Sequence, residues 1–273
     1  MRIAVHQMNS GIDIAGNVET MSKAIIEAAS SGARMYFAPE MSVLLDRQRD
    51  RARLQIQPES ESPAVAALSA AARNAGIWVH AGSVPVISEQ DPGRLANRSL
   101  LFDSSGQIAA RYDKMHLFDV DLATGESWRE SSAYIGGAGP VLADTPLGLL
   151  GLTICYDMRF PDLYSRLARS GVDALAVPAA FTVPTGKAHW HTLLRARAIE
   201  AEAFVIAAAQ SGKHADGRET YGHSLVVDPW GEVLLDMGEG ENLAIVDLPL
   251  ERIAEVRAQI PVHLNRRDIP PLP

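Results

Sequence analysis

The segment Leu149-Leu150-Gly151-Leu152-Thr153-Ile154-Cys155 is a short apolar run that ends at the only cysteine of the chain. A bounded run of this length, made of small and branched aliphatic side chains, is typical of a buried β-strand. The sequence after Cys155 predicts a helix over Asp162–Ser170 and a further strand over Ala174–Val177. A strand, a helix and a strand in this order form a β-α-β unit, which predicts two parallel strands here.

Similar patterns continue on both sides of this unit. The turn signals Asp103-Ser-Ser-Gly106 and Asp228-Pro-Trp-Gly231 predict hairpins, which add antiparallel pairs. Together the elements predict an α/β protein of mixed sheets covered by helices, in a single domain over residues 1–273. The other expected strands are 3–5, 35–38, 77–83, 97–102, 107–112, 204–209, 224–227, 232–235 and 243–247, and the other expected helices are 17–30, 64–75, 188–202 and 250–259.

The composition limits the classes of function that this chain can have. Its 273 residues are 47% hydrophobic and 21% charged, which is typical of a globular protein rather than a disordered one. The formal net charge of -8 gives no general attraction to nucleic acids or anionic membranes. No apolar run approaches the ~20 residues of a membrane span, and no targeting segment is visible. We therefore expect a cytoplasmic protein that binds neither nucleic acid nor membrane.

Three of the expected strands are followed by reactive side chains: Glu40, Lys114 and Cys155. Taken alone, each has an ordinary interpretation, because a lone cysteine usually fills a core and most Glu and Lys residues lie on the surface. In open α/β sheets, however, ligand sites gather outside the carboxyl ends of strands. A thiol, a carboxylate and an amine that arrive by the same route predict a shared site.

These three groups would suffice to hydrolyse a C–N bond. A thiol of ordinary pKa ~8.5 is mostly protonated at neutral pH, so Glu40 would take the proton as Cys155 attacks an amide or nitrile carbon. The Lys114 ammonium and a backbone N–H would stabilise the resulting negative charge, at ~3 kcal/mol per donor. The protonated Glu40 could then give its proton to a leaving amine and activate the water that releases the acyl group. This chemistry requires no cofactor and no metal.

The sequence around these residues resembles the nitrilase superfamily of carbon-nitrogen hydrolases. Pro39-Glu40 resembles the general-base motif of that family, Tyr112–Phe118 its lysine motif and Gly151–Pro161 its nucleophile motif. The resemblance covers essentially the whole chain, in the same order and at matching spacing. It implies a four-layer α-β-β-α sandwich and a homodimer that pairs through the helices expected at 162–170 and 188–202.

The resemblance also implies roles for residues that would otherwise be loop residues. Glu130 lies where the family carries a second glutamate, which positions the lysine and the substrate. Arg159 could hold a substrate carboxylate bidentately, although a structural ion pair is an equal alternative. Tyr156 would offer its backbone N–H to the oxyanion. The residues expected to bind substrate are Tyr156, Arg159, Phe181, Thr182 and His116.

Further stretches are similar to the Nit-type amidases of this family. They are Thr185–Trp190, Leu194–Glu200, Ala207–Gln210, Tyr221–Ser224 and Val227–Gly231. The similarity implies a small amide that carries a carboxylate, with deaminated glutathione as the expected substrate. The alternatives are α-ketoglutaramate, an N-carbamoyl amine and a nitrile. A binding protein that keeps the fold without catalysis is a further alternative, which the retention of the three reactive residues disfavours.

Two other features are expected to have no catalytic role. His189-Trp-His191 does not predict a metal site, because side chains two positions apart on a helix point to different faces. Lys187 stands where the family commonly has proline, and a place at the start of a helix is favoured over the pocket. The charged segment 44–62 lies where the family varies its pocket entrance, and the sequence leaves its role open.

Overall fold

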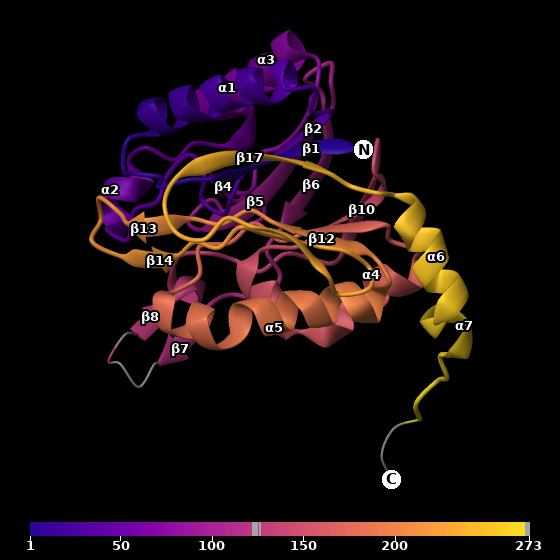
Figure 1. The fold of residues 1–273 in the computed structure, drawn as a ribbon. Helices are drawn as coiled ribbons and strands as arrows, with labels where there is room; N and C mark the ends of the chain where they lie inside the picture. The colour runs from indigo at the N-terminus through magenta and orange to yellow at the C-terminus, as the bar shows by residue number, and fades with distance from the viewer. Residues whose placement is uncertain (122–124, 126, 271–273) are drawn as a thin grey trace.

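Two β-sheets pack face to face, and helices cover the outer face of each (Figure 1). The computed structural model describes residues 1–121, 125 and 127–270. Helices α1 (Ile14–Ser30) and α3 (Pro63–Ala75) cover the first sheet, whereas α4 (Pro161–Arg169) and α5 (Val183–Ala201) cover the second. This arrangement confirms the four-layer α-β-β-α sandwich that the sequence predicted.

The first sheet has the strand order β17-β1-β2-β3-β5-β4, and β6 pairs with β5. Strand β5 runs antiparallel to both β3 and β6, and β3 is parallel to β2, so β2 and β6 point the same way. Glu40 and Lys114 follow these two strands and therefore emerge at the same edge. The strands are β1 (Arg2–Gln7), β2 (Met35–Phe37), β3 (Trp78–His80), β4 (Val84–Ile87), β5 (Leu95–Phe102), β6 (Ile108–Asp113) and β17 (Asn242–Asp247).

The second sheet has the order β16-β15-β12-β11-β10-β9. Strands β10, β11 and β12 are parallel and are joined by α4 and α5, which confirms the β-α-β units. The segment Gly148–Leu152 forms β10, so the sheet delivers Cys155 just beyond its carboxyl end. The remaining strands are β9 (Val141–Thr145), β11 (Ala174–Ala176), β12 (Phe204–Ala207), β15 (Leu225–Val227) and β16 (Val233–Asp236).

The remaining elements of the described chain are short. Two small hairpins pair β7 (Asp119–Asp121) with β8 (Ser127–Arg129) and β13 (Ser211–Lys213) with β14 (Glu219–Tyr221). The shorter helices are α2 (Arg49–Arg53), α6 (Glu251–Gln259) and α7 (Val262–Asn265), with 3-10 turns at Glu59–Glu61, Glu130–Ser132 and Cys155–Arg159. Among the helices of the described residues, none is both long enough and apolar enough to cross a membrane.

Apolar side chains from both sheets form one continuous core between them. Phe37 from the first sheet and Leu150, Leu175 and Ile206 from the second belong to the same buried cluster. The period-2 alternation of a strand divides β2 between layers, because Tyr36 points instead into the core beneath α1 and α3. Each large side chain removed from water in this way stabilises the fold by about 2 kcal/mol.

Several element boundaries differ from the sequence prediction, and two of these differences have a clear local cause. The expected strand 77–83 ends at His80, because Gly82 turns the chain with a φ of 67°. A Cβ at Gly82 would lie 1.8 Å from the Pro39 carbonyl oxygen, so only glycine fits there. Helix α5 begins at Val183, five residues before the expected Ala188. Its first turn contains Pro184, which is favourable there because the missing N–H would be unpaired anyway.

Candidate active site

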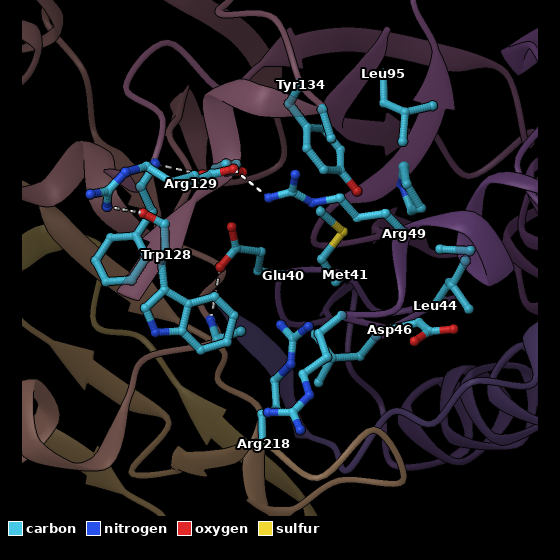
Figure 2. A pocket seen from close by; sticks show the side chains of 18 of the residues that line it. Glu40, Met41, Leu44, Asp46, Arg49, Leu95, Trp128, Arg129, Tyr134 and Arg218 are labelled. Carbon is cyan, nitrogen blue, oxygen red and sulfur yellow. Dashed lines mark hydrogen bonds between the residues drawn. The ribbon is translucent and has the colours of Figure 1, made fainter. Parts of the chain in front are cut away.

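A cavity of about 820 Å3 opens at the edge where β2 and β6 end, a size typical of small-molecule sites. The four residues expected to act in catalysis, Glu40, Lys114, Glu130 and Cys155, all line this cavity. Glu40 lies at its centre, with the rest of the lining around it (Figure 2). The structure therefore brings together groups that are far apart in the sequence.

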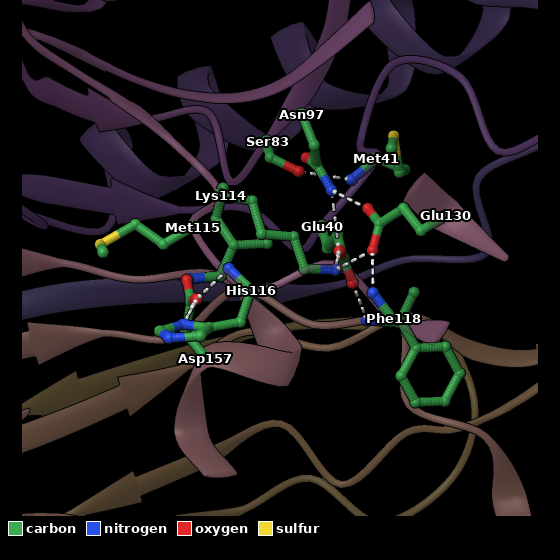
Figure 3. Close-up of polar contacts among 12 residues, drawn as sticks. Glu40, Met41, Ser83, Asn97, Lys114, Met115, His116, Phe118, Glu130 and Asp157 are labelled. Carbon is green, nitrogen blue, oxygen red and sulfur yellow. Dashed lines mark hydrogen bonds and ion pairs between the residues drawn. The ribbon is translucent and has the colours of Figure 1, made fainter. Parts of the chain in front are cut away.

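Glu40 is buried, with 5% of its surface exposed, and both of its oxygens are hydrogen-bonded. Oε1 accepts from Lys114 Nζ at 2.9 Å and from Asn97 Nδ2 at 3.0 Å (Figure 3). Oε2 accepts from the Ala180 N–H at 2.9 Å. These donors hold the carboxylate in one orientation, with an oxygen directed at the loop that carries Ala180.

Lys114 is held by two carboxylates. Its Nζ donates to Glu40 Oε1 and to Glu130 Oε2, both at 2.9 Å (Figure 3). Glu130 is itself fixed, since Oε2 accepts from the Phe118 N–H at 2.7 Å and Oε1 accepts from Asn97 Nδ2 at 3.2 Å. Glu130 therefore positions the ammonium, and Asn97 links the two carboxylates.

The charge states of the three central groups follow from burial and from one another. Burial opposes the charged forms of Glu40 and Lys114, but the attraction of Lys114 to Glu130 and Glu40, together with their hydrogen bonds, outweighs it. As a result the pKa of Glu40 lies below its ordinary value and the pKa of Lys114 well above its own. Burial and the Glu40 charge raise the pKa of the Cys155 thiol. At neutral pH the site therefore holds a thiol beside an ionised carboxylate and a cation.

Two residues at this site have a backbone conformation that is unusual for non-glycine residues. Cys155 has a φ of 47°, and Met41, directly after Glu40, has a φ of 54°. Such left-handed conformations cost about 1–3 kcal/mol and persist where the surroundings impose them. The Cys155 N–H donates to the Pro178 carbonyl at 2.9 Å, which holds the turn that exposes the thiol to the cavity.

Asp157 ties the lysine loop to the nucleophile loop, a role that the sequence did not reveal. Its side chain is fully buried. Oδ2 accepts from the Tyr112 hydroxyl at 2.7 Å and from the Ile154 N–H at 2.9 Å. Oδ1 accepts from the His116 N–H at 3.0 Å and pairs with its Nδ1 at 2.7 Å (Figure 3). The spacing between Lys114 and Cys155 is set through this carboxylate.

The residues expected to bind substrate divide into two groups. Tyr156, Phe181 and Thr182 line the cavity beside Cys155. His116 and Arg159 lie outside its lining. The structure therefore does not bring these last two to the place where the sequence analysis expected them.

The placements of His116 and Arg159 have local causes. The His116 ring stacks on Phe160 at a centroid distance of 3.7 Å while its Nδ1 contacts Asp157. Arg159 Nη2 lies 3.2 Å from His189 Nδ1, and its guanidinium covers the Phe181 ring at 5.3 Å. Among the described residues, no carboxylate forms an ion pair with Arg159.

Five arginines line the cavity, and none of them is among the site residues expected from the sequence. Arg49 and Arg218 lie on different sides of Glu40 (Figure 2). Arg218 is paired with Asp216 and covers the Trp128 ring at 5.2 Å. Within the described residues, no carboxylate forms an ion pair with Arg49. The arginines of the lining are Arg47, Arg49, Arg53, Arg129 and Arg218, and Lys187 is not among the lining residues.

The fold and this site define a class of enzyme that the comparisons with known proteins identify. The model of the carbon-nitrogen hydrolase family matches residues 2–258, and the chain belongs to this family. It is an amide-hydrolysing enzyme. It is 38% identical to a deaminated glutathione amidase of Yersinia enterocolitica over 97% of this chain and 92% of that one. It is 39% identical to one from Synechocystis, over 96% and 97%.

Solved structures of the same superfamily are similar in fold. The NitFhit protein of C. elegans has a TM-score of 0.90 and 36% identity, over 97% of this chain and 65% of that one. Nit3 of Saccharomyces cerevisiae has a TM-score of 0.86 and 29% identity, over 96% and 94%. A mutant amidase of Nesterenkonia sp. AN1, with acrylamide added to its active site cysteine, has a TM-score of 0.80 and 27% identity, over 97% and 99%.

Proposed function

We propose that the protein hydrolyses a small amide through Cys155, Glu40 and Lys114. The observation that carries this proposal is the hydrogen-bonded pair of Glu40 and Lys114 in the cavity that the thiol lines. Glu40 is ionised and takes the thiol proton as sulfur attacks the amide carbon. Protonated Glu40 then gives this proton to the departing amine, which leaves a thioester on Cys155.

The second half of the reaction uses the same groups. Glu40, ionised again, removes a proton from a water molecule as the water attacks the thioester. The carboxylate product then leaves and the thiol recovers its proton. In both steps the Lys114 ammonium and the Tyr156 N–H stabilise the oxyanion, and the low exposure of Lys114, at 2%, strengthens this interaction. Glu130 positions the ammonium and does not touch the reacting atoms.

We propose deaminated glutathione as the substrate. Its amide bond is flanked by carboxylates at both ends of the molecule, and arginines at the cavity entrance suit such an anion. Guanidinium groups bind carboxylates bidentately, so this entrance favours an anionic amide over a neutral one. The names of the similar proteins from Yersinia enterocolitica and Synechocystis support the same substrate.

A panel of substrates would test this assignment. We expect kcat/KM to be highest for deaminated glutathione, lower for the shorter α-ketoglutaramate, and lowest for an N-carbamoyl amino acid and an aliphatic nitrile. The reason is that the longer amide places its distal carboxylate among the entrance arginines. Release of the amine and the acid would be followed for each compound at equal enzyme concentration. A higher kcat/KM for the nitrile or the carbamoyl compound would contradict the proposal.

Arg49 provides a test of carboxylate recognition at the cavity entrance. We expect Arg49→Gln to raise KM for deaminated glutathione about tenfold or more and to change kcat less. The reason is that the lost charged hydrogen bond would stabilise the bound substrate and the transition state equally. Hydrolysis of a neutral amide such as propionamide should be unchanged. Arg73→Gln, on the exposed face of α3, is the matched control. Equal losses for both substrates would refute a role in carboxylate binding.

We further propose that the protein is cytoplasmic and forms a homodimer through α4 and α5. Ile199 on α5 is 48% exposed, and Trp230 in the adjoining hairpin is 46% exposed. Apolar side chains on one outer face support an interface there. We also propose that residues 1–273 form a single domain.

A further inference from the structure

We propose that His191, His223 and Asp236 form a binding site for one divalent cation of the zinc class. One donor atom from each residue lies within 4.8 Å of the other two. None of the three lines the catalytic cavity. The site therefore differs from the catalytic machinery and is independent of the proposed reaction.

The three residues converge from separate elements at the outer side of the second sheet. His191 belongs to α5, His223 lies between β14 and β15, and Asp236 is the last residue of β16. His191 Nε2 lies 2.9 Å from Asp236 Oδ2, and His223 Nδ1 lies 2.8 Å from Asp236 Oδ1. A bound cation would therefore tie α5 to the end of β16 and to the loop that precedes β15.

The donor set has the chemistry of a zinc site. Two imidazole nitrogens and one carboxylate oxygen, with water in a fourth position, are ligands that Zn²⁺ accepts in tetrahedral geometry. Zinc-to-nitrogen bonds of about 2.0 Å place tetrahedral ligands about 3.4 Å apart. The observed separations of 2.9 and 2.8 Å, which involve different oxygens of Asp236, would open by about 0.5 Å when the cation binds. The side chains are 23–35% exposed, so a cation and its water can reach them.

Neighbouring groups hold two of the three proposed ligands in place, as is common around metal sites in proteins. The His223 N–H donates to the Gly238 carbonyl at 2.7 Å, and its own carbonyl accepts from Trp190 Nε1 at 2.7 Å. Its ring stacks on Tyr221 at a centroid distance of 4.4 Å. Asp236 Oδ1 accepts from the Gly238 N–H at 3.0 Å.

The three residues lie far apart in the sequence, which explains why the sequence analysis predicted no metal site here. His189 and His191 do point to different faces, since His189 Nδ1 faces Arg159. His191 instead meets partners 32 and 45 positions further along the chain. A search for closely spaced ligands in the sequence cannot find such a site.

The test uses the full-length protein without a purification tag, treated with EDTA and carrying Cys155→Ala, so that the catalytic thiol binds no zinc. Titration with ZnCl2, followed by calorimetry, should show one ion bound per chain with a Kd in the micromolar range. A hundredfold excess of zinc over Kd should raise Tm by ~5 °C, because the ion binds only the folded state. Absence of binding at 100 µM zinc would overturn the proposal.

Variants in the same background locate the ion. His191→Gln and Asp236→Asn should each weaken zinc binding at least tenfold, as should His223→Asn, which tolerates the left-handed φ of 54° at that position. The matched control is His189→Gln, an exposed histidine on the same helix, which should bind zinc normally. If His223→Asn fails to fold, the other two variants still decide. Unchanged affinity in His191→Gln and Asp236→Asn would place the ion elsewhere and overturn the proposal.

Discussion

Cys155→Ala is expected to lower kcat for amide hydrolysis by about 10⁵-fold or more, because no other group in the site can form the acyl intermediate. Folding should be little affected. Cys155 contributes a small buried side chain, so the loss of its sulfur should cost about 1 kcal/mol, or a few degrees in Tm. Steady-state kinetics on an active substrate and a thermal melt of each protein would measure the two effects.

The composition of the chain supplies a control for this result. Because Cys155 is the only cysteine, one iodoacetamide adduct per chain identifies the modified residue without mapping. Activity should fall in proportion to the fraction of labelled protein, and Cys155→Ala should take up no label. Residual turnover above 1% in fully folded Cys155→Ala would contradict the assignment of the nucleophile.

The sequence predicted the strand-end residues of the site because a regular pattern carries them. Glu40, Lys114 and Cys155 each follow a short apolar run, and strands that run parallel end at one edge of a sheet. The hairpins that turn at Asp103–Gly106 and Asp228–Gly231 and the β-α-β units are confirmed as well, because turn residues and apolar runs are also local patterns. Local patterns of this kind determine the layers and the edge at which the reactive groups emerge.

Residues that join distant segments could not be predicted in this way. Asn97 lies inside β5 and is 1% exposed, so its pattern is that of any buried strand residue. Its Nδ2 nevertheless donates to both Glu40 and Glu130. Asp157, two residues after the nucleophile, is recognised only through its contacts with the lysine loop. Such roles depend on which loops meet in space, which a periodic pattern does not specify.

The same limit explains the residues that the sequence placed in the pocket. His116 and Arg159 are close in sequence to Lys114 and Cys155, but stacking on Phe160 and contact with His189 direct their side chains elsewhere. Three arginines of segment 44–62, Arg47, Arg49 and Arg53, line the cavity instead. Proximity in sequence to a catalytic residue therefore does not by itself place a side chain in the cavity.

Glu40→Gln is expected to lower kcat by about 10³-fold or more, because the same carboxylate moves protons in both halves of the reaction. The thiol should nevertheless stay reactive. In the native site the Glu40 charge helps to raise the pKa of Cys155, while the Lys114 cation lowers it. Removal of that charge leaves burial to raise the pKa of the thiol and Lys114 to lower it, so this pKa should fall from its native value and excess iodoacetamide should still add once per chain.

This combination separates loss of the base from loss of the site. A misfolded chain would also take up one label at its single cysteine, but it would lose the native thermal transition, whereas loss of the base alone abolishes turnover and preserves both the single labelling and the transition. Glu89→Gln is the matched control, because Glu89 is an exposed glutamate, with 75% of its side chain accessible, that pairs with Arg98 on the same sheet. It should leave kcat unchanged. A kcat for Glu40→Gln within tenfold of the native value would show that another group carries the proton.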